Sequence, residues 1–303
     1  NGAGRHLSRM DVPQVGLLAD GRRLHLQHRP IDLVLEAFGS FDEVAAAYMQ
    51  ARLKFETVLV ELAKELSVLR RPLCDLRPNV KGPTAIRMLD AAWPHRETFL
   101  TPMAAVAGSV ADEMMSALLD GRCLEKAYIN NSGDIAVYLT PGETLKLGIV
   151  GQLFYAAIDG TTELAFDRPV RGVATSGWQG RSWSLGIADA VTVLAENAAA
   201  ADVAATLIAN AVNADHEAIE RAPASEQDDQ SDLGDRMVTV NVGLLDPTTV
   251  ETALGNGIEV AGRMYEAGLI TAAVLVLKNE IRALGDLPAT LPETGSRKGN
   301  DNG

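Results

Sequence analysis

The sequence predicts an α+β fold, in which mixed and antiparallel sheets pack against long helices. Two observations support this prediction. The chain opens with strand-like segments followed by one long helix, instead of the alternating strand–helix units of a parallel α/β protein. Later strand-like segments follow one another across short turns, which favours antiparallel pairing. With 303 residues, of which 47% are hydrophobic, the chain can form one large domain or two coupled lobes.

The start of the chain predicts a hairpin and a third strand. Residues 1–13 show no periodic pattern, and we expect a loose N-terminus there. Residues 15–27 have the pattern of a β-hairpin with Asp20-Gly21 at its turn. Residues 31–37 alternate as a strand does.

Three helices are predicted in the first half. The longest begins at Ser40, where Glu43 completes a capping-box pattern, and it runs to about Leu69. Shorter helices are expected at 82–95 and 101–121. The apolar faces of the first and third helices should pack on the sheet.

The middle of the chain is rich in predicted strands. A meander is expected over 127–131, 135–139 and 144–150, and two strands around a glycine-bearing turn within 170–196. A helix follows at about 201–215.

The last third contains a polar segment and three more elements. Residues 221–236 are acidic and unpatterned, so we expect a surface loop. After it we expect a strand, a helix and a strand at 238–243, 247–267 and 270–279. Residues 291–303 should form a disordered tail. We therefore assign 14–290 to a single α+β domain, with two coupled lobes as an alternative.

The composition argues against several classes of protein. Twenty-seven basic and 40 acidic residues give a formal charge of −13, which disfavours nucleic acid and anionic membranes as partners. No apolar run reaches the roughly 18 residues of a membrane span. Cys74 and Cys123 form no CxxC or Cys/His cluster, which disfavours zinc and agrees with a reducing compartment. We expect a cytoplasmic protein with a small-molecule ligand, and a homodimer is an open alternative.

The helix at 201–215 carries a polar stripe. Asp202, Thr206 and Asn210 are four residues apart and Asn213 follows three later, so they share one face of an otherwise apolar helix. A carboxylate and a hydroxyl one turn apart can both ligate Mg²⁺. In the alternative interpretation, Asp202 helps to start the helix and Thr206 bonds its own i−4 carbonyl.

Two segments of the first half are candidate ligand contacts. NNSGD, residues 130–134, has the composition of a hairpin turn, and it also places amides, backbone N–H groups and a carboxylate at the strand ends. Thr101-Pro102-Met103 begins a predicted helix, whose unpaired N–H groups would suit an anion. Met103 also fits a core position.

The segment ATSGWQGRS, residues 174–182, combines hydroxyls, glycines and an arginine. Thr175 or Ser176 is a nucleophile only if a base lies nearby, and the segment contains no His. Arg181 suits a phosphate or carboxylate, and the glycines suit close approach to a ligand. A turn with structural hydroxyls is the alternative.

Four stretches in fixed order resemble the ApbE-like uncharacterised protein family of bacteria and archaea (UPF0280) over roughly residues 15–285. They are TPMAAVAGSVADE, YINNSGDIAV, GVATSGWQGRSWSLGIADAVTVLAE and ADVAATLIANAV. SDLGDRMVTV also fits the proteobacterial members. This resemblance implies an ApbE-like fold.

A more distant resemblance is to the Mg²⁺-dependent FAD:protein FMN transferases, which carry a GGD turn, an ATSG turn and a late AD-x-x-x-T helix. This resemblance implies a Mg²⁺ site at Asp202 and Thr206, and FAD or FMN as the bound nucleotide. We assign cofactor contacts to Thr101, Met103, Asn130, Asn131, Ser132, Gly133, Ala174 and Gly177. Catalytic roles are assigned to Asp134, Thr175, Ser176 and Arg181.

The chain departs from the transferases after the TSG turn. The transferases carry a His and an Asp-Pro segment there, whereas this chain has RSWSLGIADAV, and Arg181 stands near the position of the His. Three functions follow as hypotheses. The first is an ApbE-like, Mg²⁺-dependent enzyme acting on a flavin or another phosphate-bearing molecule. The second is a diverged hydrolase or lyase acting on a small carboxylated or heterocyclic metabolite. The third is a non-catalytic accessory protein beside a sulfur or iron–sulfur enzyme.

Overall fold

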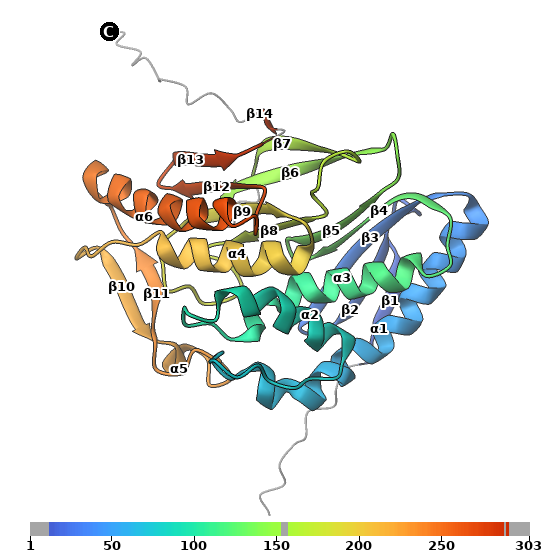
Figure 1. Ribbon diagram of the computed structural model, residues 1–303, viewed down its shortest axis with the longest axis horizontal. Helices are drawn as coiled ribbons and strands as arrows, with labels where there is room; N and C mark the ends of the chain where they lie inside the picture. The colour runs from blue at the N-terminus through green and yellow to red at the C-terminus, as the bar shows by residue number, and fades with distance from the viewer. Residues whose placement is uncertain (1–11, 153–156, 288, 291–303) are drawn as a thin grey trace, which may run out of the picture. The chain divides into compact units, whose positions relative to one another are not determined.

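The computed structural model describes residues 12–152, 157–287 and 289–290 (Figure 1). The expectations for residues 1–11 and for the tail 291–303 lie outside these ranges. The chain divides into two compact units, Asn1–Tyr138 and Leu139–Gly303, and each is described by itself.

The sheet of the first unit is built from hairpins. Neighbouring strands follow one another in chain order, from β1 to β5. Strands β1, β2, β3 and β4 pair antiparallel. The predicted first hairpin and third strand are confirmed, and Gly21 lies at the hairpin turn with φ of +68°. The strands are β1 (Gln14–Leu17), β2 (Leu24–His28), β3 (Ile31–Gly39), β4 (Leu124–Asn131) and β5 (Asp134–Leu139).

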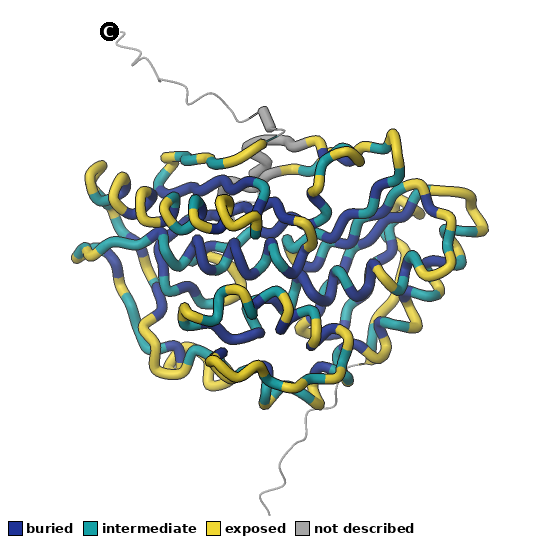
Figure 2. The backbone as a smooth tube through the Cα atoms, viewed as in Figure 1, coloured by how far each residue is buried: buried dark blue, intermediate teal, exposed yellow. Residues whose placement is uncertain are grey.

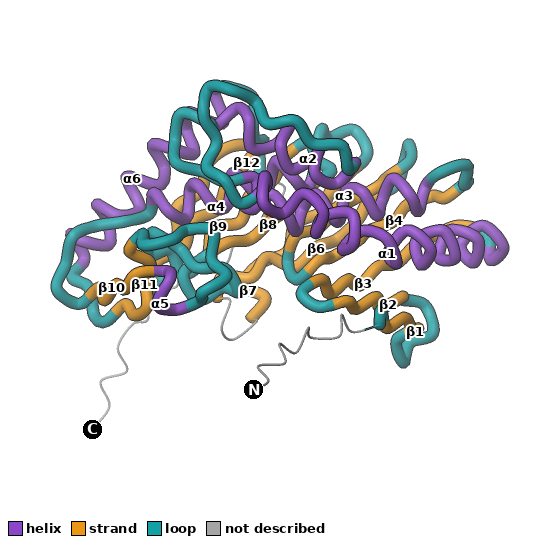
Figure 3. Tube along the Cα trace, turned by 90° about the horizontal axis from the view of Figure 1, so that it is seen from below, coloured by secondary structure: helices purple, strands orange, loops and turns teal. Residues whose placement is uncertain are grey.

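Two helices of the first unit, α1 and α3, pack on one face of these strands, and α2 packs on those two helices (Figure 3). Helices α1 and α3 contact each other and the sheet, as the sequence predicted. Ser40 caps α1 by accepting from the Glu43 N–H. The Glu43 carboxylate instead accepts from the backbone N–H of Cys123 at 2.7 Å, so the reciprocal half of the capping box serves the α3–β4 connection. The helices are α1 (Phe41–Leu69), α2 (Pro83–Ala92) and α3 (Val106–Leu119), with 3-10 turns at Trp93–His95 and Pro102–Ala105.

The second unit contains three groups of strands. Strands β8, β9, β12 and β13 are neighbours in that order, β6 and β7 pair beside β14, and β10 pairs with β11. Every residue of β9 and β12 is buried, as expected for strands covered on both faces. The strands are β6 (Thr144–Gln152), β7 (Ala157–Ala165), β8 (Gly172–Ser176), β9 (Ala190–Ala195), β10 (Ile219–Pro223), β11 (Met237–Val242), β12 (Ala272–Leu277), β13 (Glu280–Gly285) and β14 (Ala289–Thr290).

Two long helices cover the β8–β9–β12 strands of the second unit (Figure 1). Helix α4 (Ala198–Ala211) contacts β8, β9 and α6, and α6 (Pro247–Glu266) contacts β12 and β13. The buried segments of α4, β9 and β12 form its interior (Figure 2). Among the described residues, no helix is both long enough and apolar enough to span a bilayer.

Several predictions for the second unit were wrong in detail. The third strand of the expected meander, β6, pairs with β7 in a separate sheet, because β7 supplies its antiparallel partner. The expected loop at 221–236 begins with the end of β10 and the one-turn helix α5 (Ala224–Gln227), since Ala224 is buried and holds this segment down. Strands β7 and β13 were not predicted.

Candidate functional site

The TSG segment ends strand β8 in the second unit. Ala174 is fully buried. Thr175 is half-buried, and its hydroxyl lies 2.9 Å from the hydroxyl of Thr192 on the neighbouring strand β9. Ser176 is half-buried and Gly177 begins a loop that reaches β9 at Ala190. The two hydroxyls of Thr175 and Thr192 thus form a cross-strand pair beside the loop.

Asp189, the last residue of this loop, bonds to the start of the loop and to the β12–β13 turn. Its carboxylate accepts from the Trp178 indole Nε1 at 3.2 Å and from the Lys278 backbone N–H at 2.6 Å. Lys278 lies in the β12–β13 turn with φ of +49°. At Gly177 a Cβ would lie 2.5 Å from the Asp189 carbonyl oxygen, so the glycine is needed for the loop to close on itself.

The second half of the loop is anchored to helix α4. Asn210 Oδ1 accepts from the Ser184 hydroxyl at 3.1 Å and from the Leu185 N–H at 2.9 Å. Asn213, which lies just beyond the helix, donates to the Leu185 carbonyl at 3.1 Å. A Cβ at Gly186 would lie 2.1 Å from the Ala209 carbonyl oxygen. The C-terminal half of the polar stripe, Asn210 and Asn213, therefore holds the loop against the helix.

The N-terminal half of the stripe provides two side-chain oxygen groups that could ligate a hard cation. Asp202 and Thr206 are both half-buried and lie one turn apart on α4. The suggestion that Asp202 helps to start the helix was wrong, because Asn197 caps it by accepting from the Ala200 N–H at 2.8 Å. Asp202 therefore sits in the second turn, beyond the positions that cap unpaired N–H groups.

Asp202 and Thr206 could ligate a cation whose other coordination positions are filled by a bound ligand and water. Across the described ranges, no group of three or more His, Cys, Asp or Glu side chains is placed to hold a metal ion. Mg²⁺ in proteins commonly takes one or two carboxylates and fills its remaining positions with phosphate oxygens and water. Asp202 and Thr206 fit that arrangement, whereas they do not make a closed metal site.

Arg181 lies in the exposed middle of the loop, at residues 179–182. Two backbone N–H groups shortly before it donate hydrogen bonds within the loop. Trp178 donates to the Ala188 carbonyl and Gly180 to the Gly177 carbonyl, both at 3.0 Å. An anion beside the loop would therefore meet side chains such as Arg181, and not these two N–H groups.

The predicted NNSGD turn is a hairpin turn in the first unit. Ser132 and Gly133 both have positive φ, 57° and 116°, as a two-residue hairpin turn requires. Asn130 Oδ1 accepts from the Gly133 N–H at 2.8 Å. Asn131 is buried and donates to the Ala107 carbonyl at 3.0 Å, which ties the hairpin to α3. Asp134 begins β5 and is half-buried.

The expectation of unpaired N–H groups after Thr101 was wrong. Thr101 is buried and its hydroxyl accepts from the Met103 N–H at 3.3 Å, while the Ala104 N–H donates to the Thr101 carbonyl. The chain forms a 3-10 turn here before α3 begins at Val106, so both N–H groups have partners.

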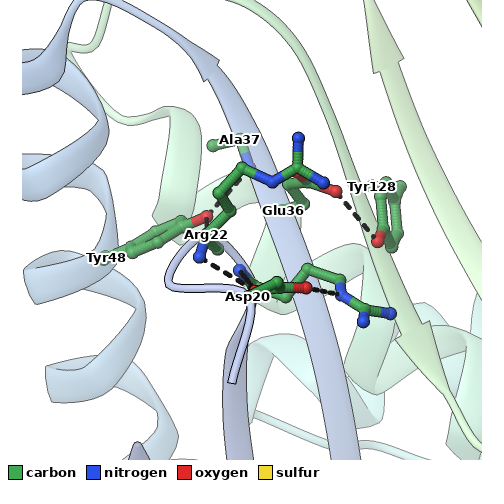
Figure 4. A network of polar contacts seen from close by, with 7 residues as sticks. Asp20, Arg22, Glu36, Ala37, Tyr48 and Tyr128 are labelled. Atoms are coloured by element: carbon green, nitrogen blue, oxygen red, sulfur yellow. Dashed lines mark hydrogen bonds and ion pairs between the residues drawn. The ribbon is translucent and has the colours of Figure 1, made fainter. Parts of the chain in front are cut away.

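A polar cluster in the first unit was not found from the sequence (Figure 4). Glu36 of β3 is buried, and its carboxylate accepts from the Tyr128 hydroxyl at 3.2 Å and lies 3.6 Å from Arg22 Nε. Burial and the Glu36 charge raise the pKa of Tyr128 to about 12. Tyr48 of α1 donates to the Arg22 carbonyl at 2.6 Å and accepts from the Ala37 N–H. Alternation along β3 places Glu36 on the face opposite the buried Leu33 and Leu35, so the sequence pattern did not indicate that Glu36 is buried.

Comparisons with known proteins place the chain in a family. A family model described as AbpE bacteria matches residues 15–283. A UPF0280 protein of Methanothermobacter thermautotrophicus is 35% identical over 193 residues, covering 60% of this chain and 72% of the relative. Another, of Methanothrix thermoacetophila, is 37% identical over 119 residues, covering 38% of this chain and 47% of the relative. The chain thus spans about half the length of this second relative.

A solved structure also resembles the chain. It is a flavin transferase ApbE from Vibrio cholerae, with a TM-score of 0.46 and 11% identity over 90% of this chain and 96% of that one. The described fold is an α+β arrangement of antiparallel strands and helices. The chain belongs to the AbpE bacteria family, and its sequence relatives are UPF0280 proteins. The resemblance to the UPF0280 family that was predicted from the sequence is confirmed.

Proposed function

We propose that the second unit binds a flavin nucleotide, or a closely similar phosphate-bearing molecule, together with a divalent cation. The observation that carries this proposal is the pair of half-buried oxygen donors, Asp202 and Thr206, on a helix whose other residues are mostly buried and apolar. A carboxylate and a hydroxyl one helical turn apart supply oxygen ligands of the kind that Mg²⁺ takes in proteins.

The cation would come with the nucleotide. Asp202 and Thr206 offer too few ligands for an octahedral ion, so phosphate oxygens and water would complete its coordination. A cation held there supplies charge neutralisation at a phosphoryl group. The sequence match of Asp202 and Thr206 to the metal-binding helix of the FAD:protein FMN transferases supports the same assignment.

The end of β8 and the loop that follows it (residues 177–189, called the TSG loop) would hold the nucleotide beside helix α4. Helix α4 packs on β8, which ends in Thr175 and Ser176, and Asn210 ties the following loop to the same helix. Arg181 is exposed in that loop, where its guanidinium would pair with a phosphate. Thr175 and Ser176 would orient the substrate through their hydroxyls.

Binding without transfer is the second candidate function. The observation that favours it is the sequence between Gly177 and Glu196, which contains no His and no Asp-Pro pair. The two candidates share the site and differ in turnover. FMN transfer joins a phosphoryl group to an acceptor hydroxyl, breaks the pyrophosphate of FAD and releases AMP. Binding alone leaves FAD intact.

The test is the thermal stability of the protein with FAD, FMN and ATP, each with and without Mg²⁺. We expect stabilisation by FAD with Mg²⁺, about 2.7 kcal/mol at a hundredfold excess over Kd, and little without the cation. Asp202→Asn and Thr206→Val should remove the stabilisation. Asp215→Asn, at an exposed position beyond α4, is the matched control and should retain it.

Chromatography of the same mixtures, after a peptide that carries an acceptor threonine hydroxyl is added, separates the two candidates. AMP release together with an FMN-modified peptide supports transfer, whereas unchanged FAD and unmodified peptide support binding alone. If no nucleotide stabilises the protein, the proposal is wrong for both candidates.

A further inference from the structure

The first unit buries an imidazole without a partner. His28 ends strand β2 and is only 5% exposed, and neither ring nitrogen has a hydrogen-bond partner within the described structure. Phe55 of α1 contacts the ring edge-on, with centroids 6.3 Å apart. Every protonation state of imidazole carries at least one N–H, so a buried His normally has an acceptor. Packing alone would be served better by an apolar ring.

His28 also lines two neighbouring clefts. One, of about 450 Å³, is bounded by His28 with Gln14, Gln27 and Arg29. The other, of about 570 Å³, is bounded by His28 and by three residues of α1 spaced four apart, which are Arg52, Glu56 and Val60. Val12 and Pro13 border both clefts. The two clefts therefore meet at His28, and we call them together the His28 groove.

The walls of the His28 groove select a type of ligand. Val12, Val15 and Val60 are exposed at 81%, 36% and 39%, and they offer apolar surface. Arg29 and Arg52 bring positive charge, against a single acid, Glu56, whose carboxylate lies 3.8 Å from Arg52 Nε. The groove thus combines an orphaned N–H donor, a cationic rim and apolar walls.

We propose that the His28 groove binds a small carboxylate that carries an apolar tail. Its carboxylate accepts from the His28 ring N–H and pairs with Arg52, and its tail covers the exposed valines. Both ring nitrogens are covered, so side chains that line the groove must move for the carboxylate to reach them. Val12 is the most exposed of these side chains. The site lies wholly in the first unit and does not depend on the nucleotide site proposed above.

The experiment is a titration of the full chain with sodium hexanoate, followed by ¹H–¹⁵N spectra of the five histidine rings. The His28 signals are assigned by their loss in His28→Phe. We expect a saturable shift of these signals with a Kd of about 1 mM. His25 is an internal control, because it lies three residues away on the opposite face of β2 and pairs with Asp32 at 2.7 Å. Its signals should not move.

Four comparisons make the result specific. Hexan-1-ol lacks the charge and acetate lacks the apolar tail. Each should therefore shift the His28 signals with a Kd at least about tenfold higher than that of hexanoate. Arg52→Gln, at an exposed position, should weaken hexanoate binding about fivefold or more. His28→Phe should raise the melting temperature, because it removes two unsatisfied polar atoms and keeps a ring against Phe55.

Two outcomes would overturn the proposal. One is the absence of a His28 shift up to about 10 mM hexanoate, ten times the expected Kd. The other is a lower melting temperature in His28→Phe, which would show that the imidazole nitrogens serve the fold itself.

Discussion

The Asp189 carboxylate accepts a hydrogen bond from the Trp178 indole at 3.2 Å, and the same carboxylate accepts from the Lys278 backbone N–H at 2.6 Å. One side chain therefore joins the start of the TSG loop to a turn that lies 89 positions after Asp189 in the chain. The loop that would carry substrate-orienting groups is fixed at this point before any ligand arrives. Such fixed positioning is what a binding or catalytic site requires.

Asp189→Asn should loosen this junction. The amide retains one acceptor but places an NH₂ group against one of the two N–H donors, so one charge-assisted bond is lost. We expect a loss of about 1–3 kcal/mol in the free energy of unfolding, measured by urea denaturation. Asp229→Asn, in the exposed segment before β11, is the control and should leave the unfolding free energy nearly unchanged. Equal stability of the two variants would show that Asp189 does not fix the loop.

Gly186→Ala should be strongly destabilising. Its Cβ would lie 2.1 Å from the Ala209 carbonyl oxygen of α4, which forces the loop and helix apart. We expect a loss of more than about 3 kcal/mol, or failure to fold. Gly262→Ala is the matched control, because nothing lies within 4 Å of its Cβ position on α6, and it should stabilise by about 0.5–1 kcal/mol. Similar melting temperatures for both variants would contradict the close packing at Gly186.

Asn210→Leu should release the loop from α4. The change leaves the Leu185 N–H and the Ser184 hydroxyl without their acceptor. We expect faster hydrogen exchange at the Leu185 amide and a loss of about 2 kcal/mol in unfolding free energy. Asn241→Leu removes an exposed bond to Glu220 and serves as the comparison. Unchanged exchange at Leu185 would mean that other contacts hold the loop.

The pH dependence of stability should include a contribution from His95. Burial lowers the pKa of His95 below its ordinary value of 6.5. The unfolded chain then binds more protons than the folded chain between these two values, so stability falls as the pH drops through this window. Above pH 6.5 His95 is neutral in both the folded and the unfolded chain, so it no longer makes stability depend on pH. His95→Gln should lose less stability than the wild type between pH 7.5 and 5, measured by urea denaturation at each pH. The same loss in both proteins would place the effect elsewhere.

Local sequence patterns predicted most of the helices and hairpins. Ser40 marked the start of α1, and the Ser132-Gly133 turn followed from its composition. Strand β13 was missed because its turn uses Lys278 and Asn279 at positive φ, where glycine is the usual signal. Strand β7 was missed because its sequence, AIDGTTELA, contains a glycine and several polar residues and lacks a regular alternation of apolar residues.

The candidate site was harder to predict because its contacts join distant residues. The stripe on α4 was visible as a period of four. Its division into two anchoring asparagines and two oxygen donors required the position of Leu185, 25 residues before Asn210. The unpartnered nitrogens of His28 were invisible for the same reason, since burial depends on α1 as much as on β2.

A cation that binds at Asp202 and Thr206 only together with a nucleotide is the central feature of the proposed site. The direct measurement is titration with Mn²⁺, in place of Mg²⁺, followed by the electron paramagnetic resonance signal of the free ion. With FAD present, the wild type should bind one Mn²⁺ per chain, and without FAD it should bind at least about tenfold more weakly, because phosphate oxygens complete the coordination. Asp202→Asn should lose this binding while Asp215→Asn keeps it. Equal Mn²⁺ binding by the wild type and Asp202→Asn, or no binding by the wild type with FAD, would contradict the account.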